Sequence, residues 1–249
     1  HGKIDSGLQA VDKLLHRLGH PDKELHLCYE AGPCGFALAR HLRKKGIACT
    51  VVAPSLTPKG KGDKVKTDRR DAQMLARLHR AGELTAVHVP DPDDEAVRDL
   101  CRARTDAVEA MRRARSQLRA FLLRNGHPAA CKAPWSDAAK RNLRKLSLRH
   151  PAMGIVLEDY ITAIDAAHAR VAGLEKAMEE QLEHWAQKPA VAALMGLRGF
   201  RTVAAMITVS ELGSIHRFAG ARQLMAYLGL VPGENSSGES RRVGSITKT

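Results

Sequence analysis

The chain has 249 residues, of which 44% are hydrophobic, 27% charged and 4% aromatic. The hydrophobic content is enough to bury a core, which excludes wholesale disorder, and the low aromatic content disfavours a β-sandwich or barrel. Lysine and arginine outnumber aspartate and glutamate by 40 to 27, so nucleic acid is the favoured partner. No apolar run reaches the roughly 18 residues of a membrane span, so no membrane is expected.

The first 93 residues are predicted to alternate helices and strands, which indicates an α/β layer with some parallel pairing. The expected elements are a helix at 6–19, a strand at 25–29, a helix at 34–45, a strand at 47–53, a helix at 67–81 and a short edge strand at 84–89. Ser6 and Thr67 are the expected N-caps, and Gly19 and Gly82 the expected helix stops. The polar, basic segment 55–66 is predicted to be a mobile loop.

Two long helices are predicted next, at 94–125 and 154–187, with a broken basic stretch between them. Their apolar residues recur at roughly heptad spacing, which favours an antiparallel or intermolecular coiled coil. The first helix is rich in arginine, and Arg112, Arg115 and Arg119 are its expected nucleic-acid contacts.

A change of composition near Pro189 predicts a third, small helical domain. The expected domains are therefore 1–93, 94–188 and 189–249. The segment Gly196–Thr202 has the sequence GLRGFRT, which is similar to the turn of helix-hairpin-helix DNA binders. Its glycine amides, with Arg198 and Arg201, are expected to contact phosphates, and the alternative is a simple helix–helix turn.

Three carboxylates are the candidates for a metal site. Asp68 and Asp71 are three residues apart at the start of a predicted helix, so both lie on one face. Glu30 directly follows a predicted strand, and ligands of open α/β sheets gather at strand ends. Together they predict a Mg²⁺ site for phosphoryl transfer. The alternative for Asp68 and Asp71 is an acidic first helical turn neutralised by neighbouring basic residues. The alternative for Glu30 is a solvated acidic residue in a loop.

A serine turn among basic residues is the second candidate site. Ser236, Ser237 and Gly238 are followed by Arg241, Arg242 and Lys248. A serine in such surroundings could attack a phosphate once its proton is removed and the phosphate charge is neutralised. The alternative is an ordinary surface turn. The five cysteines are odd in number and form no C-x-x-C pair, which indicates a reducing cytosol rather than a disulfide framework.

These motifs, taken in order, resemble the DEDD-type insertion-sequence transposases, the IS-one-hundred-and-ten family. The matching stretches are YEAGPCGFALARHL, KTDRRDAQMLARL, MGLRGFRTVAA and RFAGARQLMAYLGLVPGENSSGESRRVGSITKT. The resemblance implies a RuvC-like domain of RNase H fold, here truncated, followed by the long helical region and a C-terminal transposase domain.

The resemblance also implies the chemistry. Such enzymes insert and excise DNA, use Mg²⁺ at an acidic cluster, and are guided by a bridge RNA that pairs with donor and target. Glu30, Asp68 and Asp71 match three of the four acids, and the C-terminal serine nucleophile maps to Ser237, with Ser236 as the alternative. A homodimer or tetramer acting on the nucleoid of the bacterial cytoplasm is expected.

One departure from the family pattern concerns the first catalytic aspartate, which lies on a strand before the matched region. The chain also begins with His1 rather than Met, and its closing basic motif stops after Lys248 and Thr249, so we expect it to be incomplete at both ends and, without the first acid, inactive alone. The competing hypotheses are a RuvC-like metal nuclease or resolvase without a serine step, and a non-catalytic nucleic-acid-binding protein.

Overall fold

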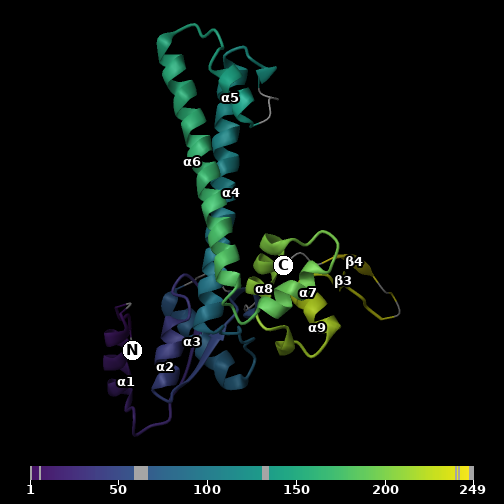
Figure 1. The fold of residues 1–249 in the computed structure, drawn as a ribbon. Helices are drawn as coiled ribbons and strands as arrows, with labels where there is room; N and C mark the ends of the chain where they lie inside the picture. The colour runs from purple at the N-terminus through teal and green to yellow at the C-terminus, as the bar shows by residue number, and fades with distance from the viewer. Residues whose placement is uncertain are drawn as a thin grey trace. The chain divides into compact units, whose positions relative to one another are not determined.

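The computed structural model describes residues 2–5, 7–58, 67–130, 135–238, 240 and 242–246. The chain divides into two compact units, His1–Pro90 and Asp91–Thr249. Both are mainly helical with small sheets, and Figure 1 traces their elements. Within the described ranges, no helix combines the length and the hydrophobicity that crossing a membrane requires.

The first unit alternates helices and strands, as the apolar spacing predicts. Its elements are α1 (Leu8–Leu18), β1 (His26–Glu30), α2 (Ala37–Lys44), β2 (Ala48–Val52), the 3₁₀ turn η1 (Pro54–Leu56) and α3 (Asp68–Ala81). Gly19 and Gly82 end α1 and α3 in the left-handed conformation, with φ of 92° and 72°, which glycine adopts without steric cost. The Thr67 side chain caps α3 by accepting a hydrogen bond from the Arg70 amide, whereas Ser6 lies outside the described residues.

The sheet of the first unit consists of β1 and β2, which pair in parallel with Glu30 beside Val52. Within the described residues β1 has no strand on its other edge. The predicted strand at 84–89 is reduced to one antiparallel bridge between Val52 and Ala86. Among the described residues, two backbone hydrogen bonds accompany this bridge, from the Ala53 amide to the Thr85 carbonyl and from the Val87 amide to the Val51 carbonyl.

Side-chain alternation along β1 directs the two faces of this sheet to different helices. Leu27 and Tyr29 pack against the core that α1 and α2 form with β2, where Leu15 and Leu42 are fully buried. Cys28 faces the other way, and its thiol lies 3.9 Å from the carbonyl oxygen of Leu75 in α3. The side of β1 that carries Cys28 and Glu30 is therefore the side next to α3.

The second unit contains the two long helices and everything after them. Its elements are α4 (Pro92–Arg124), α5 (Asp137–Leu143), α6 (Pro151–Leu182), α7 (Lys188–Met195), α8 (Thr202–Leu212), the 3₁₀ turn η3 (Ile215–Arg217), α9 (Ala221–Tyr227), β3 (Pro232–Glu234) and β4 (Val243–Ile246). The short helix α5 lies in the stretch that the sequence predicts to be broken. Ser136 caps it, and Ala139 and Leu143 are buried one turn apart. Pro189, the expected domain boundary, lies within α7 of this unit.

Helices α4 and α6 lie side by side over most of their length (Figure 1). They are antiparallel, because Arg104 pairs with Glu175 while Phe121, further along α4, contacts Tyr160, further back in α6. The predicted antiparallel pairing of two long helices is thus present within one chain.

Two separate apolar cores stabilise this unit. The tip core lies where α4 ends and α6 begins, and Leu118 and Ile161 are fully buried in it. The base core lies at the opposite ends of these helices, where Met178 and Met206 are buried. Helix α6 ends at Leu182 rather than at the predicted 187. After this point Trp185 enters the base core, and its indole N–H donates to Asp94 at 2.7 Å.

Candidate functional site

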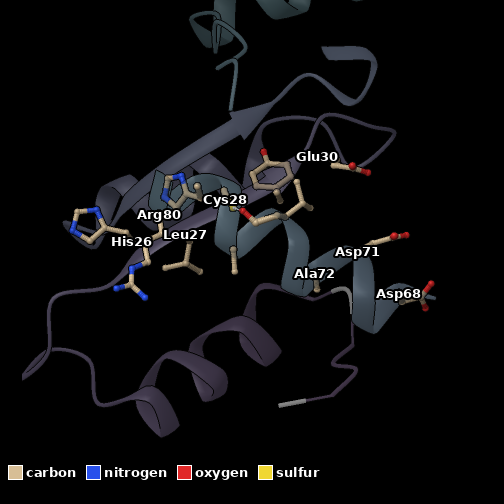
Figure 2. Close-up of a pocket in the computed structure, with 12 residues that line it drawn as sticks. His26, Leu27, Cys28, Glu30, Asp68, Asp71, Ala72 and Arg80 are labelled. Atoms are coloured by element: carbon tan, nitrogen blue, oxygen red, sulfur yellow. Dashed lines mark hydrogen bonds between the residues drawn. The ribbon is translucent and has the colours of Figure 1, made fainter. Parts of the chain in front are cut away.

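A pocket of about 950 Å³ lies between β1 and α3 in the first unit, and Figure 2 shows its lining. All five residues of β1 line it. The α3 residues Ala72, Leu75 and Ala76 form an apolar part of the wall. Among the described residues β1 pairs on one edge only, with β2.

The three predicted acids, Glu30, Asp68 and Asp71, all line this pocket. Glu30 is the last residue of β1, while Asp68 and Asp71 occupy the first turn of α3. The strand end and the helix start thus meet at one end of the pocket, and the labelled carboxylates in Figure 2 point toward the same side. Sequence reasoning placed Glu30 just after the strand, one residue from its observed position.

The acidic end of the pocket is open to solvent. Asp68 forms an ion pair with Lys3 at 2.9 Å, and the Asp68 side chain is 82% exposed. The hydrogen bond to Asp68 raises the pKa of Lys3. An exposed pair of this kind contributes little to stability, so Asp68 can exchange Lys3 for another cation at small cost.

The donor chemistry of this end suits a hard divalent cation, because three carboxylates supply oxygen ligands. Among the residues that the structure describes, however, no three histidine, cysteine, aspartate or glutamate side chains gather closely enough to hold an ion. Glu30, Asp68 and Asp71 therefore share a pocket without forming a complete set of ligands.

The opposite end of the pocket has a different character. His26 and Arg80 line it there, well separated from the carboxylates in Figure 2, and His79 also lines the pocket. Between the two ends lies Cys28, whose pKa is raised by burial, so its thiol stays protonated and is a poor nucleophile. The sequence analysis did not predict this basic end, which arises only when β1 and α3 come together.

The predicted serine turn lies at the end of a β-hairpin in the second unit. Strands β3 and β4 are antiparallel, and the backbones of Ser237 and Ser240 bridge the turn. The Ser236 hydroxyl donates to Oε1 of Glu234 at 2.7 Å, an interaction that the sequence analysis missed. Of the basic residues expected nearby, Arg242 is described and exposed, and Arg241 and Lys248 lie outside the described residues.

The three predicted arginines of α4 have different surroundings. Arg112 is exposed. Arg115 and Arg119 both stack over the ring of Trp135, with guanidinium carbons 5.4 and 5.2 Å from its centroid. Arg115 also donates to Nε2 of His168 at 2.6 Å. Desolvation and the nearby Arg119 charge lower the pKa of Arg115. Arg115 is thus partly committed to contacts within the tip of the helical hairpin.

The glycine-rich segment predicted to contact phosphates connects α7 and α8. Gly199 has a φ of 97°, which lets the chain turn sharply between the two helices. Arg198 and Arg201 are exposed, while Phe200 packs against the base core. The segment is therefore a turn that joins two helices and is anchored by Phe200, with its arginine side chains exposed to solvent.

The comparisons with known proteins place the chain in a class. A family model for a DEDD transposase domain, described as a transposase, matches residues 1–127, just over half of the chain. A second, described as the transposase IS116/IS110/IS902 family, matches residues 191–249. The chain is thus a transposase sequence by class. It belongs to the IS110 family of transposases.

Named relatives agree with this assignment. The y4qE protein of Sinorhizobium fredii, which is named as a transposase, is 43% identical over 247 residues, covering 99% of this chain and 60% of that protein. The transposase for insertion sequence element IS1533 of Leptospira borgpetersenii is 29% identical over 214 residues, covering 85% of this chain and 62% of that protein. The chain thus spans about three fifths of the length of these relatives.

Proposed function

We propose that this chain is the larger part of a DNA transposase that cuts and rejoins DNA for an insertion sequence. The observation that carries the proposal is the meeting of Glu30, Asp68 and Asp71 at one end of the β1–α3 pocket, in a chain that belongs to a DEDD transposase family. Carboxylates at a strand end and a helix start are suited to phosphoryl transfer, because together they can bind the cations that neutralise phosphate charge.

The open edge of β1 supports a RuvC-like reading of the first unit. A two-stranded sheet is marginal by itself, and a long edge invites another strand. The relatives are longer than this chain, and the family resemblance implies a strand that carries a further aspartate. Such a strand on the open edge would bring a fourth carboxylate to the acidic end of the pocket.

Mg²⁺ fits the donor set, and Glu30, Asp68 and Asp71 would hold it. When bound, the ion would neutralise developing charge on phosphate oxygens. The chain's own residues have three further tasks. Lys3 must release Asp68, the serine turn must supply the attacking hydroxyl, and basic side chains such as Arg242 must bind the DNA backbone.

The nucleophile carried over from the family is Ser237, with Ser236 as the alternative. Donor and target DNA are the substrates of the proposed reaction, and a bridge RNA and assembly into a dimer or tetramer follow from the family resemblance. The +13 charge supports a polyanionic partner. Arg112, Arg115, Arg119, Arg198, Arg201 and Arg242 are the proposed nucleic-acid contacts within the described residues.

Metal binding by the chain itself tests the acidic site without any DNA reaction. Mn²⁺, which paramagnetic resonance detects directly, is titrated against the chain and its Glu30→Gln and Asp71→Asn variants. We expect weak binding that each substitution reduces further, because each removes one oxygen ligand. The matched control is Glu83→Gln, an acid that follows α3 and does not line the pocket. Binding that depends equally on Glu83 would refute the site.

The full-length transposase tests the reaction. With Mg²⁺ and donor and target DNA, we expect strand exchange through a covalent serine–DNA adduct, and loss of both when the nucleophile is replaced by alanine while DNA binding persists. Strand cutting without an adduct would favour a RuvC-like nuclease or resolvase. DNA binding without any cutting would favour a non-catalytic nucleic-acid-binding protein.

A further inference from the structure

The connection between α8 and α9 holds an arginine against two aromatic rings. The guanidinium carbon of Arg217 lies 4.2 Å from the centroid of the Phe218 ring and 4.5 Å from that of the Tyr227 ring. The two rings also contact each other, with centroids 5.2 Å apart and an angle of 58° between their planes. The Nε–H of Arg217 donates to the carbonyl oxygen of Leu212, the last residue of α8, at 2.9 Å. The guanidinium is therefore held in one orientation by two rings and a backbone carbonyl.

The positive charge of Arg217 is not neutralised by these contacts. All three of its partners are uncharged, and among the described residues its terminal guanidinium nitrogens contact no carboxylate. Arg102 differs, because it forms two hydrogen bonds with the Glu211 carboxylate at 2.7 and 2.8 Å. Between Glu211 and Glu234 the sequence contains Arg217, Arg222 and a histidine but no acidic residue. The terminal N–H groups of Arg217 are thus oriented in advance and suited to an anion such as phosphate.

Exposed apolar surface lies beside this charge. Tyr227 is 48% exposed although its ring contacts both Arg217 and Phe218, and Ile215 in the preceding 3₁₀ turn is exposed as well. An unpaired nucleotide presents a flat base together with a phosphate, so an aromatic ring beside a cation suits it. A duplex presents its phosphates but keeps its base faces stacked inside. Ring and charge together therefore favour a single strand over a duplex.

We propose that Arg217 and Tyr227 form a binding site for an unpaired nucleotide of single-stranded DNA or RNA. The base stacks on the solvent-exposed surface of the Tyr227 ring, and the terminal N–H groups of Arg217 donate to a phosphate of the same strand. Phe218, which is half-buried, positions the arginine. The inference rests on the proposed transposase function and deepens it, because it adds a site that selects a single strand.

Photocrosslinking tests the stacking contact in the unsubstituted chain. Short oligomers of deoxyuridine and of uridine, each with one 5-iodouracil base, are irradiated with the chain, and tandem mass spectrometry identifies the crosslinked residue. The two probes differ only in the 2′-hydroxyl, so the one that binds more tightly identifies DNA or RNA as the source of the strand. We expect crosslinks on Tyr227 with at least one probe. Crosslinks found only at other residues would overturn the inference.

Substitutions of the ring separate stacking from general adhesion to apolar surface. Tyr227→Leu keeps an apolar side chain but removes the ring, so affinity for the oligomers should fall by about 5- to 150-fold, while Tyr227→Phe should retain it. The matched control is Met225→Ala, because Met225 is 44% exposed on the same helix but lies about 200° away around its axis. An equal loss for Met225→Ala, or an equal loss of duplex affinity in Tyr227→Leu, would contradict stacking.

The salt dependence of binding tests the phosphate contact separately. Arg217→Gln should flatten the slope of log K against log salt by about 0.7 for a single strand, because one phosphate contact is lost. Tyr227→Leu should leave this slope unchanged, since the ring carries no charge. Arg217→Lys should keep the slope but bind more weakly than the unsubstituted chain, because lysine lacks the planar fork. An unchanged slope in Arg217→Gln would refute the phosphate contact.

The full-length transposase separates this inference from the proposed function. Strand exchange, together with single-strand binding that Tyr227→Leu does not weaken, would retain the transposase function and overturn the nucleotide site. Crosslinking at Tyr227 without any strand exchange would retain the nucleotide site and overturn the transposition reaction. Strand exchange together with crosslinking at Tyr227 supports both.

Discussion

Replacing Arg112 by glutamine tests whether the open face of α4 binds DNA or RNA. Its side chain is exposed and forms no ion pair with another described residue, so it is available to phosphate. Each phosphate neutralised by a cation adds about 0.9 to the slope of log K against log salt for duplex DNA, and about 0.7 for single strands. Arg112→Gln should therefore flatten the slope by about one phosphate contact while leaving the free energy of unfolding within about 0.5 kcal/mol.

Arg115→Gln should behave differently, because Arg115 contacts Trp135 and His168 as well as solvent. Losing one cation–π contact and one hydrogen bond costs about 1–2 kcal/mol in the free energy of unfolding. If Arg112, Arg115 and Arg119 all contacted duplex phosphates, replacing the three would flatten the slope by about 2.7. The contacts to Trp135 predict a smaller change, together with a measurable loss of stability.

Fluorescence anisotropy of labelled DNA and RNA, from about 50 to about 200 mM salt, measures the slope, and urea unfolding measures stability. Lys176→Gln is the matched control, because Lys176 is an exposed cation on the partner helix α6 that already pairs with Glu180. It should leave the slope unchanged. An unaltered slope for Arg112→Gln, or an equal change for Lys176→Gln, would refute a specific phosphate contact on α4.

Two further predictions concern stability. Leu118 is fully buried in the tip core, so Leu118→Ala should lower the free energy of unfolding by about 2–5 kcal/mol. Leu123 is 62% exposed on the same helix, so Leu123→Ala should change it by less than about 0.5 kcal/mol. Equal losses for the two variants in urea unfolding would contradict the packing. The hydrogen bond from His41 to Asp12 is 2.6 Å long and lowers the pKa of Asp12. The stabilisation that this pair contributes is therefore complete above the ordinary aspartate pKa of about 3.9, and it is lost as the pH falls through the lowered pKa of Asp12. Asp12→Asn should reduce the fall in the free energy of unfolding over that acid range. The same fall in the variant and in the unsubstituted chain would contradict the pairing.

Much of the first unit could be predicted from local signals. Gly19, Gly82 and Thr67 mark helix ends by backbone conformation and capping, which depend on neighbours a few residues away. Asp68 and Asp71 share a face because of helical spacing alone. The position of Glu30 beside them depends on β1 and α3 coming together, and the strand pattern only indicated that it would lie at a strand end.

Contacts distant in sequence were beyond prediction. No local pattern indicates that Arg115 would stack on Trp135 and donate to His168, because these residues lie on three different segments. The pairing of Glu234 with Ser236, by contrast, follows from the alternation of an extended chain and was available in the sequence once the hairpin was known. Helix α5 also had a readable signal, since a serine cap precedes it.

Helix α4 runs without a break through both the base core and the tip core. The orientation of one core about the helix axis therefore fixes the orientation of the other. Cys101 in the base core and Leu118 in the tip core are about 17 positions apart, a rise of about 26 Å along one helix. Deleting a single residue between them would turn the tip about 100° relative to the base and misalign every contact with α6. Removing about seven residues from each helix would nearly restore the alignment, because seven residues make almost two full turns. The helical hairpin of α4 and α6 can therefore change its length only in steps of about two helical turns, and intermediate lengths would lose the alignment of one core.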